Sequence, residues 1–108
     1  MQDIGVVEFH EAFAGQVLAN LTAMASQTFA SKNFNGQDAV GDIPMEQINT
    51  RGGSLSLGHP FGATGGRLVT TASNRMRDEG HKYALITACA DGGLAHSAIL
   101  EKWEASAK

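Results

Sequence analysis

The stretch SLGHPFGATGG, Ser56–Gly66, contains four glycines, a proline and a histidine, and an amphipathic segment begins directly after it. In that segment Leu68, Ala72 and Met76 recur at helical spacing, and Gly80 is placed to end the helix. The sequence therefore predicts a loop that leads into the N-terminus of a helix. Free backbone N–H groups at such an N-terminus can stabilise an anion or a developing oxyanion.

His59 is the side chain of this loop that is best able to take part in a chemical reaction. It lies between Gly58 and Pro60, and the proline lacks an N–H group and restricts the backbone of His59. A Walker-type phosphate loop needs a lysine that is absent here, and the dinucleotide fingerprint GxGxxG is absent too. Two interpretations remain: a tight structural turn with an incidental histidine, and a loop that directs His59 at a substrate.

The elements before this loop begin with Ile4–Phe9, which is short, apolar and β-branched and is predicted to be a strand. The next segment, 10–30, is predicted to be helical, with Glu11 in its first turn, where a carboxylate suits the helix dipole. Its apolar stripe of helical period consists of Phe13, Val17, Leu21 and Met24. The polar segment 31–50 has weak periodicity and is predicted to be a surface excursion.

After the second helix, Tyr83–Cys89 is predicted to be a strand buried on both faces. Leu94–Trp103 is predicted to be another strand, and the short break ADGG between them favours an antiparallel pair. Strands and helices that alternate in this way predict an α/β fold.

Composition limits the class of protein. A net charge of −3 and a hydrophobic content of 43% indicate a folded chain without a nucleic-acid-binding surface. Arg67, Arg75 and Arg77 are expected on a solvated helix face. The single cysteine permits no intramolecular disulfide. No signal peptide is visible and no apolar run reaches the ~20 residues of a membrane span. The abrupt start at a strand suggests a chain that begins inside a larger protein.

Three residues that could take part in catalysis stand at the ends of predicted elements: His10, His59 and Cys89. A zinc protease motif HExxH is excluded because Ala14 occupies the second histidine position. The two other histidines lack the spacing of metal ligands, so no metal site is expected. Each of the three also has a purely structural interpretation: His10 as a cap or core residue, His59 as part of a turn, and Cys89 as an inert core thiol.

The motifs HEAF at 10–13, GGSLSLGHPFGATGGR at 52–67 and CADGG at 89–93, in that order and spacing, resemble the C-terminal part of thiolases. The sequence looks closest to 3-ketoacyl-CoA thiolases of the trifunctional-protein β-subunit type, which carry HEAF where many thiolases carry NEAF. The resemblance implies a C-terminal fragment of a thiolase-fold domain over 1–108, with a mixed sheet and flanking helices. The half that carries the nucleophile would be absent.

The resemblance implies an acyltransferase that cleaves a 3-ketoacyl-CoA with coenzyme A into acetyl-CoA and a shortened acyl-CoA, as in fatty acid β-oxidation. By motif position, His59 would activate a nucleophilic cysteine and bind the thioester oxygen. His10 would orient a water in the same oxyanion hole, and Cys89 would be the acid/base cysteine. Phe13 would line the pantetheine channel.

One departure from the family pattern follows Cys89, where Asp91 takes the place of the first glycine of CxGGG. The backbone N–H of Asp91 would then contribute to a second oxyanion hole, with Gly92 beside the substrate. Because Cys89 is the only cysteine, the chain cannot supply the nucleophile as well. We therefore expect it to be inactive alone.

The resemblance also implies coenzyme A as a co-substrate and no covalently bound cofactor. Expected partners are acyl-CoA substrates, the N-terminal thiolase half, a second subunit and a hydratase/dehydrogenase α subunit. The location would be the cytoplasm in a bacterium and the mitochondrion in a eukaryote. Two alternatives stay open: a biosynthetic acetoacetyl-CoA thiolase, and a non-catalytic interaction or lipid-carrier module. The joint presence of His10, His59 and Cys89 argues against the latter.

Overall fold

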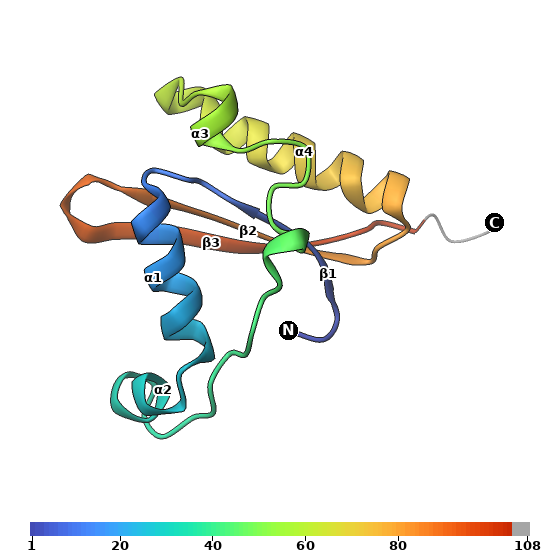
Figure 1. The fold of residues 1–108 in the computed structure, drawn as a ribbon. Coiled ribbons are helices and arrows are strands. Elements are labelled where there is room, and N and C mark those ends of the chain that lie inside the picture. The colour runs from blue at the N-terminus through green and yellow to red at the C-terminus, as the bar shows by residue number, and fades with distance from the viewer. Residues whose placement is uncertain (105–108) are drawn as a thin grey trace.

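A computed structural model describes residues 1–104, and in it three strands form one mixed sheet with helices on both faces (Figure 1). The strands are β1 (Ile4–Phe9), β2 (Tyr83–Ala90) and β3 (Leu94–Glu101), and they lie in the order β1-β2-β3. β1 is parallel to β2, and β2 is antiparallel to β3. The predicted α/β class, the bounds of β1 and the antiparallel hairpin are therefore confirmed.

The helices divide between the two faces of the sheet. They are α1 (Ala14–Ala25), α2 (Gln27–Asn33), α3 (Ser54–Leu57) and α4 (Thr64–Glu79), with 3-10 turns η1 (Met45–Gln47), η2 (Phe61–Ala63) and η3 (Asp91–Gly93). Helix α4 crosses one face, and α1 lies on the other (Figure 1). Each contact forms a small core: one contains Val6, Ala72, Met76 and Ala84, and the other Val7, Phe9, Val17 and Ile43.

Helix α4 buries the predicted face and ends at the predicted residue. Leu68, Ala72 and Met76 are buried, which is the stripe that the spacing indicates. Gly80 follows with a backbone φ of 76°, the left-handed conformation that glycine adopts without steric cost at a helix end. The N-terminus of α4 lies near the sheet edge where β1 ends, because its first residue, Thr64, contacts His59, whose ring lies beside that of His10.

The predicted helix over 10–30 is wrong in its extent. The HEAF segment is not helical, so Glu11 lies outside any first turn, and Phe13 is an extended residue with 73% of its surface exposed. The helix also breaks at Ser26, whose hydroxyl accepts a hydrogen bond from the N–H of Phe29 and caps α2. Serine competes with the helix in this way because its side chain can satisfy a free N–H group.

Segment 31–50 is mostly exposed, but its last third returns to the sheet. Ile43 and Asn49 are both 8% exposed, and Ile48 forms an isolated parallel bridge with Val7. The segment is thus pinned beside β1 before the chain reaches the glycine-rich loop.

The prediction that β2 is buried on both faces is wrong for this chain. Ala84 is buried, whereas most other residues of β2 are half-buried and most of β3 is exposed. Helix α4 packs on β1 and β2, and the core on the α1 side also contains β1 with Leu85 of β2 packed against it. Leu94 and Ile99 on the edge strand β3 remain 68% and 65% exposed.

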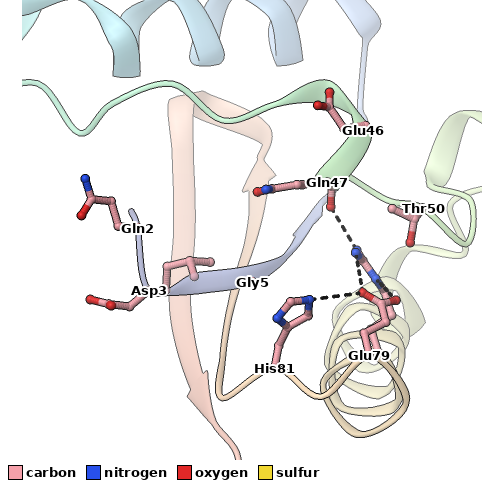
Figure 2. Close-up of a pocket in the computed structure, with 10 residues that line it drawn as sticks. Gln2, Asp3, Gly5, Glu46, Gln47, Thr50, Glu79 and His81 are labelled. Carbon is pink, nitrogen blue, oxygen red and sulfur yellow. Dashed lines mark hydrogen bonds and ion pairs between the residues drawn. The ribbon is translucent and has the colours of Figure 1, made fainter.

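The expectation of a solvated arginine face is wrong for Arg75, which is 1% exposed. Its guanidinium donates to Glu8 at 2.9 Å, to Glu79 at 2.9 Å and to the carbonyl of Gln47 at 3.2 Å. Glu79 and Gln47 lie beside a cavity of about 570 Å³ at the start of β1 (Figure 2). Burial raises the pKa of the Glu8 carboxyl, although the ion pair with Arg75 opposes this. Arg77 is exposed, as predicted.

Candidate active site

The six residues singled out from the motifs line one cavity of about 870 Å³. They are His10, Phe13, His59, Cys89, Asp91 and Gly92. Parallel strands end at the same edge of a sheet, so the end of β1 carries His10 to the end of β2, where Cys89 lies. The loop before α4 brings His59 to that edge. The cavity therefore lies where ligands of α/β proteins are usually bound.

His10 directly follows β1 and is 5% exposed. Its backbone N–H donates to the carbonyl of Thr87 on β2, and its Nδ1 lies 2.8 Å from Oγ of Ser54. Burial lowers the pKa of His10, and His59 and Arg67 lower it further. The imidazole is therefore mainly neutral at pH 7.

His59 is held by the helix that follows its loop. Its Nδ1 lies 2.7 Å from Oγ1 of Thr64, the first residue of α4, which is 2% exposed. The His59 and His10 rings are 4.1 Å apart between centroids, and Phe61 meets the His59 ring edge-on at 5.1 Å. The imidazole of His59 thus has one nitrogen fixed while its ring is exposed to the cavity.

The turn that follows His10 is fixed by Glu11 and Asn49. One carboxylate oxygen of Glu11 accepts from the Asn49 side chain at 2.6 Å, and the other accepts from the N–H of Leu55 in α3 at 3.0 Å. Asn49 also exchanges two hydrogen bonds with the backbone of Phe9, at 2.8 and 2.9 Å. A Cβ atom on Gly53 would overlap the Glu11 carboxylate, so only glycine permits this approach.

The hairpin between β2 and β3 forms the opposite wall of the cavity. Cys89 is half-buried and pairs with Ala95 across the hairpin. Gly92 and Gly93 have φ values of 77° and 75°, in the left-handed region that glycine tolerates. These two residues let the chain reverse tightly beside Cys89, while the side chain of Asp91 is exposed.

Four residues of the site were not singled out by the motifs: Asn49, Ser54, Thr64 and Arg67. Ser54 and Thr64 lie within the glycine-rich motif, but nothing in a single sequence tells which imidazole each one contacts. Arg67 is half-buried and donates to Ser54 Oγ at 3.0 Å, so it also departs from the expected solvated face. A polar residue at the end of a weakly periodic segment carries no signal, and Asn49 is such a residue.

The part of the chain that the structure describes contains no group of three or more His, Cys, Asp or Glu side chains placed to hold a metal ion. Within the same residues, no helix is long and apolar enough to cross a membrane.

A family model of the thiolase C-terminal domain matches residues 1–102. The chain belongs to the thiolase family. Its thiolase relatives include the mitochondrial trifunctional enzyme subunit beta of Bos taurus, which is 60% identical over 104 residues, covering 95% of this chain and 22% of that protein. A probable 3-ketoacyl-CoA thiolase of Caenorhabditis elegans is 48% identical over 103 residues, covering 95% of this chain and 23% of that protein.

Solved thiolase structures share the fold. The crystal structure of human mitochondrial 3-ketoacyl-CoA thiolase matches with a TM-score of 0.70 and 29% sequence identity, covering 94% of this chain and 22% of that one. The three-stranded sheet and its helices are thus the C-terminal part of a thiolase fold. The chain spans only 22% or 23% of the length of these relatives.

Proposed function

We propose that this chain forms one wall of the active site of a 3-ketoacyl-CoA thiolase, which transfers an acyl group from a 3-ketoacyl-CoA to coenzyme A. The observation that carries the proposal is the convergence of His10, His59 and Cys89 on one cavity. These residues belong to segments far apart in the sequence, and each belongs to a motif of the thiolase family. Relatives named trifunctional enzyme subunit beta and 3-ketoacyl-CoA thiolase support this substrate class.

The reaction needs a second thiol, because Cys89 is the only cysteine among the 108 residues. In the proposed mechanism a cysteine thiolate from outside this chain attacks C3 of the 3-ketoacyl-CoA. The C2–C3 bond then breaks, the shortened acyl group stays on that cysteine as a thioester, and acetyl-CoA leaves as its enolate. The thiol of coenzyme A then attacks the thioester and releases the shortened acyl-CoA.

In these steps the residues of this chain stabilise negative charge and transfer protons. His59 takes the proton of the nucleophilic thiol and donates to the thioester oxygen as negative charge develops. His10 holds a water in the same oxyanion hole. Cys89 gives its proton to C2 of the enolate and later recovers one from the thiol of coenzyme A. The backbone N–H of Asp91 contributes to the second oxyanion hole, and Gly92 and Phe13 contact the substrate.

The surface of the chain supports assembly with further protein. Phe13, Phe61, Leu94 and Trp103 are between 68% and 83% exposed, which is a large exposure for four large apolar side chains of one small domain. We propose that they pack against the remaining part of the thiolase and a second subunit, with an α subunit of a β-oxidation complex as a further partner. In a eukaryote we place this assembly in the mitochondrion, where the trifunctional enzyme relatives are named, and in a bacterium in the cytoplasm.

The test uses the complete protein that contains this chain, mixed with a 3-ketoacyl-CoA and coenzyme A while the keto-enolate absorbance is followed. We expect turnover, and we expect Cys89→Ala and His59→Ala each to lower kcat by about 10²-fold or more. His96→Ala is the matched control for the histidine, since His96 is exposed on β3 and does not line the cavity, and it should leave kcat unchanged. The 108-residue chain alone should show no turnover.

Two results would contradict the proposal. Full turnover by the Cys89→Ala enzyme would remove the thiol from the mechanism. If the complete protein binds acyl-CoA without cleaving it, and neither Cys89→Ala nor His59→Ala changes the affinity, the protein is a binding module instead.

A further inference from the structure

Ser54 stands between two side chains that differ in what they can donate and accept. Its Oγ lies 2.8 Å from Nδ1 of His10 and 3.0 Å from Nη2 of Arg67. Ser54 is 7% exposed and His10 is 5% exposed, so water has little access to this contact. The hydrogen bonds of Ser54 must therefore be satisfied by these two neighbouring side chains rather than by water.

The guanidinium of Arg67 can only donate, so it occupies one lone pair of the Ser54 hydroxyl. The hydroxyl keeps one proton of its own. Among the hydrogen-bond partners within residues 1–104, Nδ1 of His10 is the only acceptor in reach of that proton. If Nδ1 carried a proton instead, two donors would point at Ser54 and its buried hydroxyl proton would have no acceptor, which is unfavourable.

We propose that Ser54, oriented by Arg67, is a positioning residue that holds neutral His10 in the tautomer with its proton on Nε2. Nδ1 then accepts from the serine, and the nitrogen on the other side of the ring is a hydrogen-bond donor. His10 has no further hydrogen-bond partner for Nε2 in the described part of the chain, and its ring lines the cavity. The imidazole therefore presents an N–H group to whatever fills the cavity beside it.

The surroundings of His10 favour the neutral ring that this assignment requires. Burial lowers the pKa of His10 most, and the charges of His59 and Arg67 lower it further, whereas the charge of Glu11 raises it. A doubly protonated ring would give Nδ1 a proton and break the contact with the serine hydroxyl. Only the use of the N–H group, which would hold a water or an oxyanion, rests on the proposed thiolase function; the tautomer does not.

The tautomer is measured by NMR on the full 108-residue chain labelled with ¹⁵N-histidine, at a pH where His10 is neutral. Signals of His10 are assigned by their loss in His10→Gln. We expect Nε2 of His10 to be protonated and Nδ1 to be unprotonated. In Ser54→Ala the ring exchanges between tautomers, so the Nε2 resonance should move downfield, toward that of an unprotonated nitrogen.

Ser56→Ala is the matched control, because the Ser56 hydroxyl lies on the same short helix and donates to the carbonyl of Gly53. It should leave the His10 signals unchanged. Arg67→Met keeps the Ser54 hydroxyl and removes the donor that orients it, so it should move the Nε2 resonance in the same direction as Ser54→Ala. A wild-type His10 protonated on Nδ1, or an Nε2 resonance that neither variant moves, would overturn the proposal.

Kinetics separate this proposal from the proposed function. In the complete protein Ser54→Ala should lower kcat by about tenfold with a smaller change in KM, since the N–H group serves the transition state. An inactive wild-type protein whose His10 is fixed with its proton on Nε2 would refute the thiolase function and leave the positioning role of Ser54 standing.

Discussion

Asn49→Ala should destabilise the chain far more than the loss of an ordinary surface amide. The Asn49 side chain is the partner of both the N–H and the carbonyl of Phe9, and both residues are almost fully buried. Each backbone group left without a partner costs about 1–3 kcal/mol. Asn49 also has a φ of 49°, a left-handed conformation that costs alanine about 1 kcal/mol more than asparagine. The total is about 3–7 kcal/mol, a large part of the ~5–15 kcal/mol that stabilises a small domain.

Urea unfolding followed by far-UV circular dichroism measures this loss. Asn49→Asp separates its two causes, because aspartate tolerates the left-handed conformation but cannot donate to Phe9 and faces the Glu11 carboxylate. It should be destabilised at pH 7 and partly recover in acid, where a protonated carboxyl can donate again. Asn33→Ala, which removes an exposed amide bonded to the carbonyl of Phe29, should cost less than about 0.5 kcal/mol. A loss below about 1 kcal/mol in Asn49→Ala, or an Asn49→Asp chain as stable as wild type at pH 7, would refute the reasoning.

Three further predictions concern stability. Arg75→Met leaves Glu8 as a buried unpaired carboxylate and should lower the free energy of unfolding by about 3–5 kcal/mol. The double variant Arg75→Met with Glu8→Gln should recover most of this loss in the same urea assay. Equal losses in the single and the double variant would contradict the prediction. His10 has a folded-state pKa below its unfolded value of 6.5, so its contribution to stability should be complete above pH 6.5 and be lost as the pH falls through the folded-state pKa. That acid-side loss should disappear in His10→Gln; its persistence there would assign it to other groups. Gly53→Ala should lower the free energy of unfolding by about 1–3 kcal/mol, because its Cβ displaces the Glu11 carboxylate. An unchanged unfolding midpoint would show that the Glu11 carboxylate can move without loss of stability.

Local patterns predict the regular elements well where burial follows the chain's own periodicity. Ile4–Phe9 is apolar and β-branched throughout, and Leu68, Ala72 and Met76 repeat at helical spacing, so the strand and the helix are found from sequence. The convergence of His10 with Cys89 also follows from sequence, once both are placed at the ends of strands in one α/β sheet. Their catalytic roles remain predictions until variants are measured.

Apart from the break at Ser26, which is a local cap, most of the failures come from contact between distant segments. Asn49 reaches Phe9 across 40 residues and Ser54 reaches His10 across 44, and no periodicity reports such a contact. Arg75 has the polar character of a solvated residue, yet a carboxylate on the adjacent strand makes its burial possible. In the same way HEAF is kept out of the helix by its side-chain contacts, although its apolar spacing continues the stripe.

The crossover between β1 and β2 runs from His10 to Lys82 and contains all four α-helices of the described chain. Parallel pairing of this kind forms only after a long loop has closed, and such non-local pairing slows folding. The hairpin of β2 and β3 is local and can form early, so the pairing of β1 with β2 is the slow step that we expect to limit the folding rate. His10 and Cys89 meet only at that step, which makes assembly of the cavity a late event in the life of the newly made chain.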